Sequence, residues 1–309
     1  MVRRTLLPEG SWYKGNLHTH TTCSDGSASP QETAEAYRRA GYAFLAITDH
    51  FVYGRHEKLG REDFLLFPGV EFDSTADFGN RSVHLVAVGT PEDSAIEEGC
   101  RFEQLRGRKI GEIAAYMTAR DHLTVLAHPY WSWLDFSQAL SFEGLTGMEI
   151  FNGTCEASWL SGQAQAFFHQ ILWNGRRPLC FASDDTHQFH KDFGWGYITV
   201  KAPRLTHQAI RDAILAGSFT ATAAYPGEEG PRILDFAVED DTAVLTASPC
   251  RSLYIYSGWG DAAVHGTRAE PVSRLTARIP AGAPFVSAMC VDFAGHITWS
   301  QPIFGGTDS

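Results

Sequence analysis

Basic residues are few in this sequence, and long apolar runs are missing. The 309 residues include 25 Lys and Arg against 36 Asp and Glu, so the formal net charge is −11. This balance argues against a protein that binds nucleic acid through a broad basic face. No run of about 18 apolar residues occurs, and the basic opening lacks the apolar stretch of a signal peptide. We therefore expect no membrane-spanning helix and no membrane partner.

Cysteines are too scattered for a disulfide framework or a zinc ribbon. No C-x-x-C pair occurs among the six, which are Cys23, Cys100, Cys155, Cys180, Cys250 and Cys290. In a chain of this size that spacing is typical of reduced thiols, and we expect a cytoplasmic protein. The composition is 44% hydrophobic and 20% charged, as in ordinary globular proteins. The length allows two domains, or one large α/β domain with an appendage.

Up to about residue 225, short apolar runs alternate with helical patterns. The runs are apolar on both faces, as strands of a covered parallel sheet are, and span 43–48, 64–70, 83–88, 124–127, 147–151 and 179–182. A helix over 30–40 is predicted from the start signal Ser29-Pro30-Gln31-Glu32. Further helices are expected over 97–120, 156–174 and 206–216. This alternation predicts an α/β barrel or a doubly wound sheet.

Past Pro226 the pattern changes to short alternating strands. They are expected at 233–238, 243–247, 252–256, 275–279, 285–292 and 296–300. Turn residues between them predict a small antiparallel β unit of the sandwich type. The stretch 225–231 has the composition of a linker. We therefore divide the chain into a first domain, 1–225, and a small all-β domain, 226–309.

Histidines and carboxylates cluster at or near predicted strands, most of them at strand ends. They are His18, His20, Asp25, Asp49, His50, Glu71, His84, His128, Asp184, Asp185 and His187. Each alone has an ordinary explanation, since a lone histidine such as His84 is more often a hydrogen-bonded core residue. Together they mark the carboxyl ends of strands, where active sites of α/β proteins gather.

This ligand set without cysteine suits zinc, manganese or iron. It exceeds what one tetrahedral ion needs, so we expect two or three divalent ions that share a carboxylate. Glu71 is the best candidate for that bridge.

The ordered motifs N-L-H-T-H-T-T-C-S-D-G, T-D-H, G-V-E, A-H-P and S-D-D-T-H resemble those of PHP-domain (polymerase and histidinol phosphatase) proteins. The resemblance covers about residues 14–225. It implies a distorted (β/α)7 barrel, up to three ions and, in many members, phosphoesterase activity. The form of the last motif, the stretch 149–153 and the tail 299–304 are similar to a carbaryl-hydrolase-like branch, whose named member cleaves a carbamate ester.

The resemblance also implies how the ions are held. His18, His20, Glu71 and an aspartate of the last motif would hold the first ion. Glu71, His84 and His128 would hold the second, and Asp25, His50 and His187 the third. The last motif is one residue longer than the usual S-D-x-H, so either Asp184 or Asp185 is the ligand, and we favour Asp184. Asp49 and the other aspartate would orient ligand histidines.

We therefore expect a metal-dependent hydrolase of a small anionic phosphate ester, in which Glu71, Asp184 and His187 are catalytic. Substrate contacts are assigned to Arg55, His56, Arg81 and His190, although each is equally explained as a solvated surface residue. Hydrolysis of a carboxyl or carbamate ester or an amide by the same site is the alternative. A non-catalytic metal-binding scaffold is opposed by the filled ligand positions. An oligomer is possible, and a proofreading nuclease is disfavoured by the acidic balance.

Overall fold

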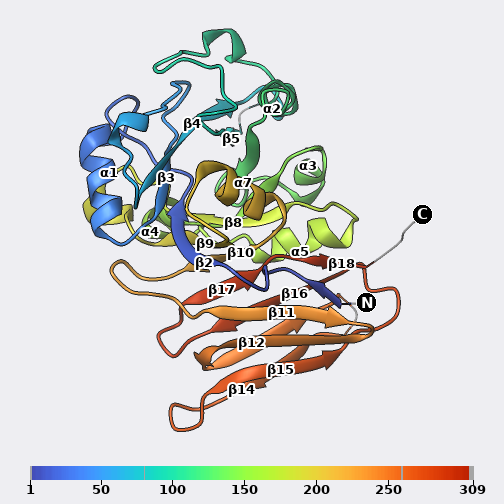
Figure 1. The fold of residues 1–309 in the computed structure, drawn as a ribbon. Coiled ribbons are helices and arrows are strands. Elements are labelled where there is room, and N and C mark those ends of the chain that lie inside the picture. Colours follow the sequence, from blue (N-terminus) through green and yellow to red (C-terminus); the bar gives the residue numbers. More distant parts are fainter. Residues whose placement is uncertain (1, 80, 259, 306–309) are drawn as a thin grey trace.

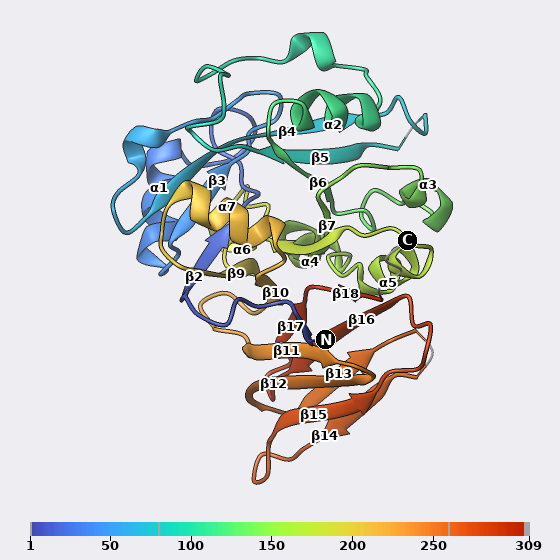
Figure 2. The same ribbon diagram turned by 45° about the vertical axis from the view of Figure 1, so that its right-hand side comes forward.

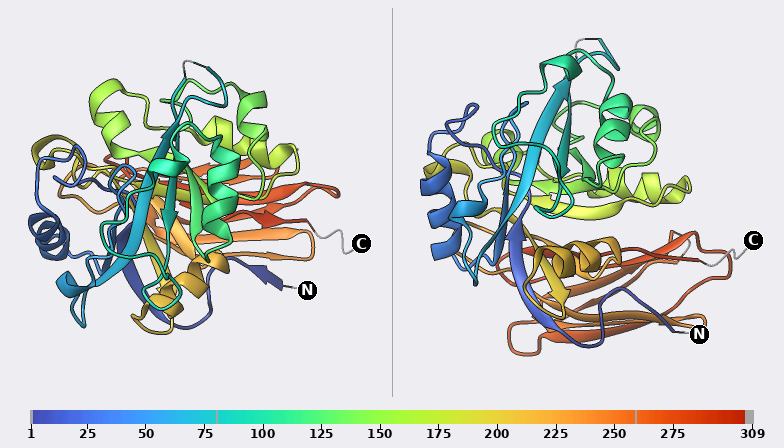
Figure 3. Two further views of the ribbon diagram at one scale, coloured as in Figure 1. Left: turned by 90° about the horizontal axis from the view of Figure 1, so that it is seen from above. Right: turned by 45° about the horizontal axis from the view of Figure 1, so that its top comes forward.

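The computed structural model describes residues 2–79, 81–258 and 260–305 and has a mixed α/β architecture (Figure 1). The part coloured blue to yellow carries the helices, which lie around strands β2 to β10 (Figures 1 and 2). From residue 219 onward the described elements are all strands, and the orange and red ones stack on one side of the helical part (Figure 3).

One large sheet runs through both parts. Its strands are hydrogen-bonded in the order β14-β13-β16-β17-β10-β9-β2-β3-β4-β5-β6-β7-β8, with β18 on β16. Their bounds are β2 (Ser11–Asn16), β3 (Phe44–Ile47), β4 (Leu65–Ser74), β5 (Val83–Val88), β6 (Leu123–Ala127), β7 (Gly147–Asn152), β8 (Leu179–Ser183), β9 (Gly196–Ala202), β10 (Phe219–Ala223), β13 (Ser252–Tyr256), β14 (Ala262–His265), β16 (Phe285–Val291), β17 (Ile297–Ser300) and β18 (Ile303–Phe304).

The expected closed barrel is not confirmed. In the described ranges no strand ladder joins β8 back to β2 or β9, so the sheet stays open. The side chain of Asn16 occupies that junction, because its amide oxygen accepts from the Asp184 N–H at 3.0 Å. The sheet is also not uniformly parallel: β5 runs antiparallel to β4 and β6, and β9 runs antiparallel to β2 and β10.

Helix α1 (Pro30–Arg39) begins where the sequence predicts. The Ser29 hydroxyl accepts from the Glu32 N–H, and the Glu32 carboxylate accepts from the Ser29 N–H, which forms a complete capping box. The other helices are α2 (Ile110–Thr118), α3 (Phe136–Leu140), α4 (Gly153–Trp159), α5 (Gln165–Trp173), α6 (Phe189–Asp192) and α7 (His207–Leu215).

Two expected helices are shorter than predicted. The stretch 97–120 contains only the 3₁₀ turn Glu103–Leu105 and α2, because Gly99 and Gly107 adopt φ values of 72° and 71° that a helix does not tolerate. The stretch 156–174 is divided between α4 and α5, because Leu160 takes the left-handed conformation at φ 53° and ends α4.

A smaller sheet packs on one end of the large one. Its order is β1 (Val2–Arg4), β11 (Ile233–Glu239), β12 (Thr242–Cys250) and β15 (Val272–Arg278). Alternate side chains of β11 and β12, such as Phe236 and Leu245, form an apolar core with Leu253 of β13 and Ala288 of β16. The earliest strand thus lies in the same sheet as strands of the last third of the chain.

All six cysteines are free thiols. None of the helices in the described ranges combines the length and the apolar character needed to span a bilayer.

Candidate metal centre

Backbone hydrogen bonds bring the predicted ligand segments side by side. The Asp185 N–H donates to His18 O at 2.9 Å, and the His20 N–H donates to Thr186 O at 2.9 Å. On the other flank the Thr48 N–H donates to Thr19 O at 2.8 Å. A few isolated backbone hydrogen bonds therefore link the segments that follow β2, β3 and β8 beyond the regular strands, without a ladder between β2 and β8.

The same sheet places the remaining ligands next to these segments. His50 forms a parallel bridge with Glu71, and the Phe51 N–H donates to Glu71 O at 2.8 Å. In the β4–β5 ladder, Asp73 lies opposite His84, and in the β5–β6 ladder, His84 lies opposite Ala127. His128 directly follows β6. Predicted ligands that are distant in sequence thus meet along neighbouring strand ends.

Glu71 lies at the centre of this arrangement and is buried, with 1% of its surface exposed. Imidazole nitrogens surround both of its carboxylate oxygens. The nitrogen–oxygen distances are 3.2 Å for His18 Nε2, 3.1 Å for His20 Nε2, 3.2 Å for His50 Nδ1, 2.9 Å for His84 Nδ1 and 3.5 Å for His128 Nε2. One carboxylate therefore faces five histidine rings, as a bridging ligand does.

Asp185, and not Asp184, joins this cluster, which corrects the preference from sequence. Asp185 Oδ1 lies 3.1 Å from His18 Nε2 and 3.0 Å from His20 Nε2. The backbone of Asp185 is left-handed, at φ 57°, and this breaks the alternation of the preceding strand.

Asp184 points elsewhere. Its carboxylate accepts from the Tyr37 hydroxyl at 2.8 Å and from the Gly196 N–H at 2.8 Å. Burial raises the pKa of Asp184 to about 6, even though these donors oppose the rise. Asp184 therefore positions the segment after β8 and does not face the cluster.

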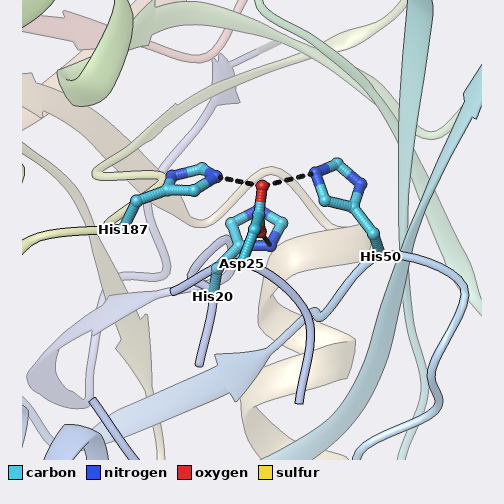
Figure 4. A group of neighbouring side chains, drawn as sticks. All are labelled: His20, Asp25, His50 and His187. Carbon is cyan, nitrogen blue, oxygen red and sulfur yellow. Dashed lines mark ion pairs between the residues drawn. The ribbon is translucent and has the colours of Figure 1, made fainter. Parts of the chain in front are cut away.

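A second group extends from the cluster toward solvent (Figure 4). Asp25 Oδ2 lies 3.4 Å from His187 Nε2 and 3.7 Å from His50 Nε2, between the two rings. Asp25 Oδ1 lies 3.6 Å from His20 Nδ1. Asp25 is half exposed, so this group forms the open side of the site.

Buried partners hold several ligand rings from behind. His18 Nδ1 lies 2.8 Å from Glu149 Oε1, and the other oxygen of Glu149 accepts from the His128 N–H at 2.8 Å. The ring nitrogen His187 Nδ1 lies 2.8 Å from Asp185 O. Such contacts fix the ring orientation and leave the opposite nitrogen free for an ion.

Asp49 contacts the histidines only indirectly. Its carboxylate accepts from the Thr21 N–H at 2.8 Å and from the Ser24 hydroxyl at 2.6 Å. Ser24 in turn lies 3.3 Å from His20 Nδ1. Asp49 thus anchors the loop that carries Asp25 and acts on His20 through Ser24, not on His50.

The electrostatics of the cluster are those of strongly interacting opposite charges. Burial alone raises the pKa of the Glu71 carboxyl, but the rings of His18, His50 and His84 outweigh burial and hold that pKa well below its usual range. Burial alone lowers the pKa of His20, yet the neighbouring carboxylates of Asp185 and Glu71 raise it to about 10. The charged form of each carboxylate and histidine in the cluster is therefore stabilised by neighbours of opposite charge.

The residues present fit divalent cations. Three groups offer ligand atoms that lie within 4.8 Å of one another, namely His18, His20, Glu71 and Asp185; His20, Asp25, His50 and His187; and His50, Glu71 and His84. Asp185 Oδ1 and His50 Nδ1 are buried without a hydrogen-bond partner. Nitrogen and carboxylate donors that converge with unused lone pairs form the ligand set of first-row metal ions.

A cavity of ≈ 330 Å³ opens onto these groups. Cluster residues on its wall include Asp25, Glu71, His128, Asp185 and His187. The rest of its lining comes from the loop after β6 and from α4 and α6, namely Trp131, Thr154, Cys155, Ser158, Trp159, Gln188, Lys191 and Asp192. A reactant bound there would contact the cluster on one side and these side chains on the other.

The four predicted substrate contacts do not line this cavity. Arg55 is held by Glu57 at 2.6 Å and by Ser94 O at 2.7 Å, and His56 lies 3.4 Å from Glu98. Arg81 donates to Gln138, and His190 is exposed. These side chains order loops or face solvent, and the prediction that they bind substrate is not supported by their positions.

Sequence reasoning missed the roles of Glu149, Trp159 and Lys191. Glu149 is a buried acid in the otherwise uncharged strand β7. Because a buried carboxylate needs a charged or hydrogen-bonding partner, its position in an apolar run indicated a contact with the cluster. Trp159 and Lys191 belong to short helices whose positions near the cluster depend on the fold. No pattern in their segments indicates a binding site.

Comparison with known proteins gives one short sequence match. No protein-family model matches the chain. Among curated proteins, it is 55% identical over 40 residues to the DNA polymerase/3'-5' exonuclease PolX of Bacillus subtilis (strain 168). These residues are 13% of this chain, and the chain spans 7% of the length of that protein.

Solved structures give a match over nearly the whole chain. A two-domain protein of Bacteroides vulgatus ATCC 8482, described as containing a predicted PHP-like metal-dependent phosphoesterase, aligns with 96% of this chain and 97% of its own, at a TM-score of 0.50 and 15% identity. A candidate metal-dependent phosphoesterase of Bifidobacterium adolescentis ATCC 15703 aligns with 68% of this chain and 98% of its own, at a TM-score of 0.46 and 16% identity.

Nothing in these matches supports the carbaryl-hydrolase-like branch. At 15% identity, the Bacteroides match is evidence of a shared fold. This chain therefore has the fold of a two-domain protein described as PHP-like.

Proposed function

We propose that this chain is a metal-dependent hydrolase that cleaves a small phosphate ester. The carrying observation is the position of Glu71, which faces five histidine rings at distances between 2.9 and 3.5 Å. Burying so many titratable groups together is costly for stability unless cations compensate them. The open cavity beside the cluster indicates that the arrangement serves chemistry.

Two or three ions of zinc, manganese or iron would be held here. Glu71 with His18, His20 and Asp185 would hold one, Glu71 with His50 and His84 a second, and Asp25 with His20, His50 and His187 a third. Divalent ions at such a site supply Lewis-acid activation of water and neutralise the charge of a phosphoryl group. His128, 3.5 Å from Glu71, can complete a ligand set.

The remaining side chains orient the reactants. Glu149 fixes the His18 ring and, through the His128 N–H, the backbone after β6. Asp49 holds the loop of Asp25 on the open side of the site. Lys191 lines the same cavity and places a positive charge beside it, which favours an anionic substrate despite the acidic net charge of the chain.

The PHP resemblance and the shared fold support this proposal together with the geometry. We also propose that the chain divides functionally near residues 225–231. The part before this stretch would hold the ions, and the strands after it would close one edge of the large sheet.

The test is metal removal and restoration. Chelation and gel filtration should abolish release of inorganic phosphate from a panel of phosphate monoesters, and added manganese, zinc or iron(II) should restore it. The His128→Gln variant should lose metal and activity, whereas His265→Gln, which changes a histidine on the distant strand β14, should lose neither. Full activity in protein shown by elemental analysis to contain no metal would overturn the proposal.

A further inference from the structure

Two tryptophans line the cavity beside the cluster, namely Trp131 and Trp159. The Trp131 ring lies 5.0 Å from the His128 ring and 5.6 Å from the His84 ring, edge to face in both cases. The Trp159 ring lies 6.0 Å from that of Trp131, at a tilt of 48°. The two indoles thus form a continuous surface that leads away from the ligand histidines.

Trp159 is poorly covered by the protein itself. It remains 59% exposed although it lines the cavity, and it is the last residue of α4. Large aromatic side chains that stay exposed beside a site commonly supply a contact surface for a ligand. Nearby, the Lys191 ammonium lies 5.8 Å from the Trp159 ring centre and supplies a positive charge at the cavity.

The wall is joined rigidly to the metal centre. Asn152, which caps the start of α4 by accepting from the Cys155 N–H, also donates to Glu149 at 2.9 Å and to Asp185 at 3.2 Å. The Thr154 hydroxyl in the first turn of α4 lies 2.5 Å from Asp185 O. Helix α4 is therefore tied at its start to residues of the cluster, and Trp159 lies at its other end.

We propose that the substrate is a phosphate ester whose organic group is a planar aromatic ring, packed against Trp159 and Trp131. This inference rests on the proposed function, because it assumes that the phosphoryl group lies at the cluster. The cavity of ≈ 330 Å³ has the volume of about ten waters, which leaves most of its space for the organic group. A short aliphatic group would cover less of the indole surface and make no ring–ring contact with it.

The experiment compares two non-hydrolysable ligands, phenylphosphonate and propylphosphonate, on metal-loaded protein. Tryptophan fluorescence and calorimetry give both dissociation constants. We expect phenylphosphonate to bind about tenfold more tightly, and Trp159→Ala to remove most of this preference by weakening phenylphosphonate binding more than propylphosphonate binding. The matched control is Trp133→Ala, since Trp133 is 81% exposed and does not line the cavity. It should keep the full preference.

Equal binding of the two phosphonates by the unmodified protein would overturn this inference. So would a Trp159→Ala variant that keeps the preference for the phenyl compound. Hydrolysis of phenyl phosphate and propyl phosphate is measured in parallel on the same samples. Equal kcat/KM values would overturn the inference and leave the hydrolase proposal standing, whereas metal-loaded protein inert toward both esters would overturn the proposed function itself.

Discussion

The two ends of the large sheet bury opposite kinds of side chain. Between β2 and β8, the strand ends bury His18, Glu71 and Asp185 almost completely. Where β13 and β16 face the smaller sheet, the buried side chains are apolar, as Phe236 and Leu253 illustrate. Backbone ladders hold both ends together, parallel in part at the first and antiparallel at the second, so the buried side chains are what distinguishes them, and only the apolar ones are explained by stability. Burying charged side chains lowers the stability of the fold, and proteins retain such an arrangement where it serves function.

The largest effect should come from removing the shared carboxylate. Glu71→Gln keeps the shape of the side chain but deletes the charge that faces five histidines. We expect a loss of about 10³-fold or more in kcat/KM and fewer bound ions per chain. Phosphate-release kinetics and elemental analysis measure both, and circular dichroism checks the fold. A variant that keeps its ions and its activity would show that Glu71 is not central.

The apolar end should respond in stability and not in chemistry. Phe236 is fully buried, so Phe236→Ala should lower the free energy of unfolding by about 3–5 kcal/mol. Val244→Ala, on the outer face of β12, is the control and should cost less than about 1 kcal/mol. Guanidinium unfolding gives both values. Loss of metal binding in folded Phe236→Ala protein would contradict the separation of the apolar end of the sheet from the metal site.

Glu149 should show an intermediate effect, because it touches the ligands and not the ions. Glu149→Gln removes the charge that holds the His18 ring, and we expect metal affinity to fall by about 10- to 100-fold. Competition with a chromophoric chelator measures this change. An unchanged affinity would mean that the His18 ring is positioned by packing alone.

The last effect is a pH dependence of stability outside both regions. Burial lowers the pKa of His122 to about 4, so the unfolded chain takes up a proton near pH 6.5 that the folded chain refuses. Stability is therefore lost as the pH falls from about 6.5 toward 4, at up to about 1.4 kcal/mol per pH unit. The difference between the unmodified protein and His122→Gln, both metal-free, should shrink over this range in unfolding titrations. A constant difference would contradict it.

Short sequence patterns correctly predicted the strands and helices that are determined by neighbouring residues. The strand at 83–88 and the helix with the Ser29–Glu32 capping box are found as expected. The helix expected over 97–120 is found only over Ile110–Thr118, because Gly99 and Gly107 with positive φ interrupt the first part of the stretch. The closed barrel could not be judged from sequence, since closure depends on how β2 and β8 meet, and that contact joins residues about 170 positions apart.

The residue types of the site were predictable from the sequence, but the directions in which their side chains point were not. His18, His20 and Glu71 follow from strand ends and motif order. The choice between Asp184 and Asp185 required the backbone, because a left-handed residue turns the second carboxylate toward the cluster. Trp159 and Lys191 join the cavity only through the placement of α4 and α6, which no short stretch of sequence determines.

The continuity of the large sheet has a mechanical consequence. β17 pairs with β10 over four residue pairs, so residues from the last part of the chain cover an edge that would otherwise bare its N–H and C=O groups. A protease cut within 225–231 would therefore yield two fragments that remain associated through the β10–β17 ladder. They would separate only under conditions that unfold this part of the sheet.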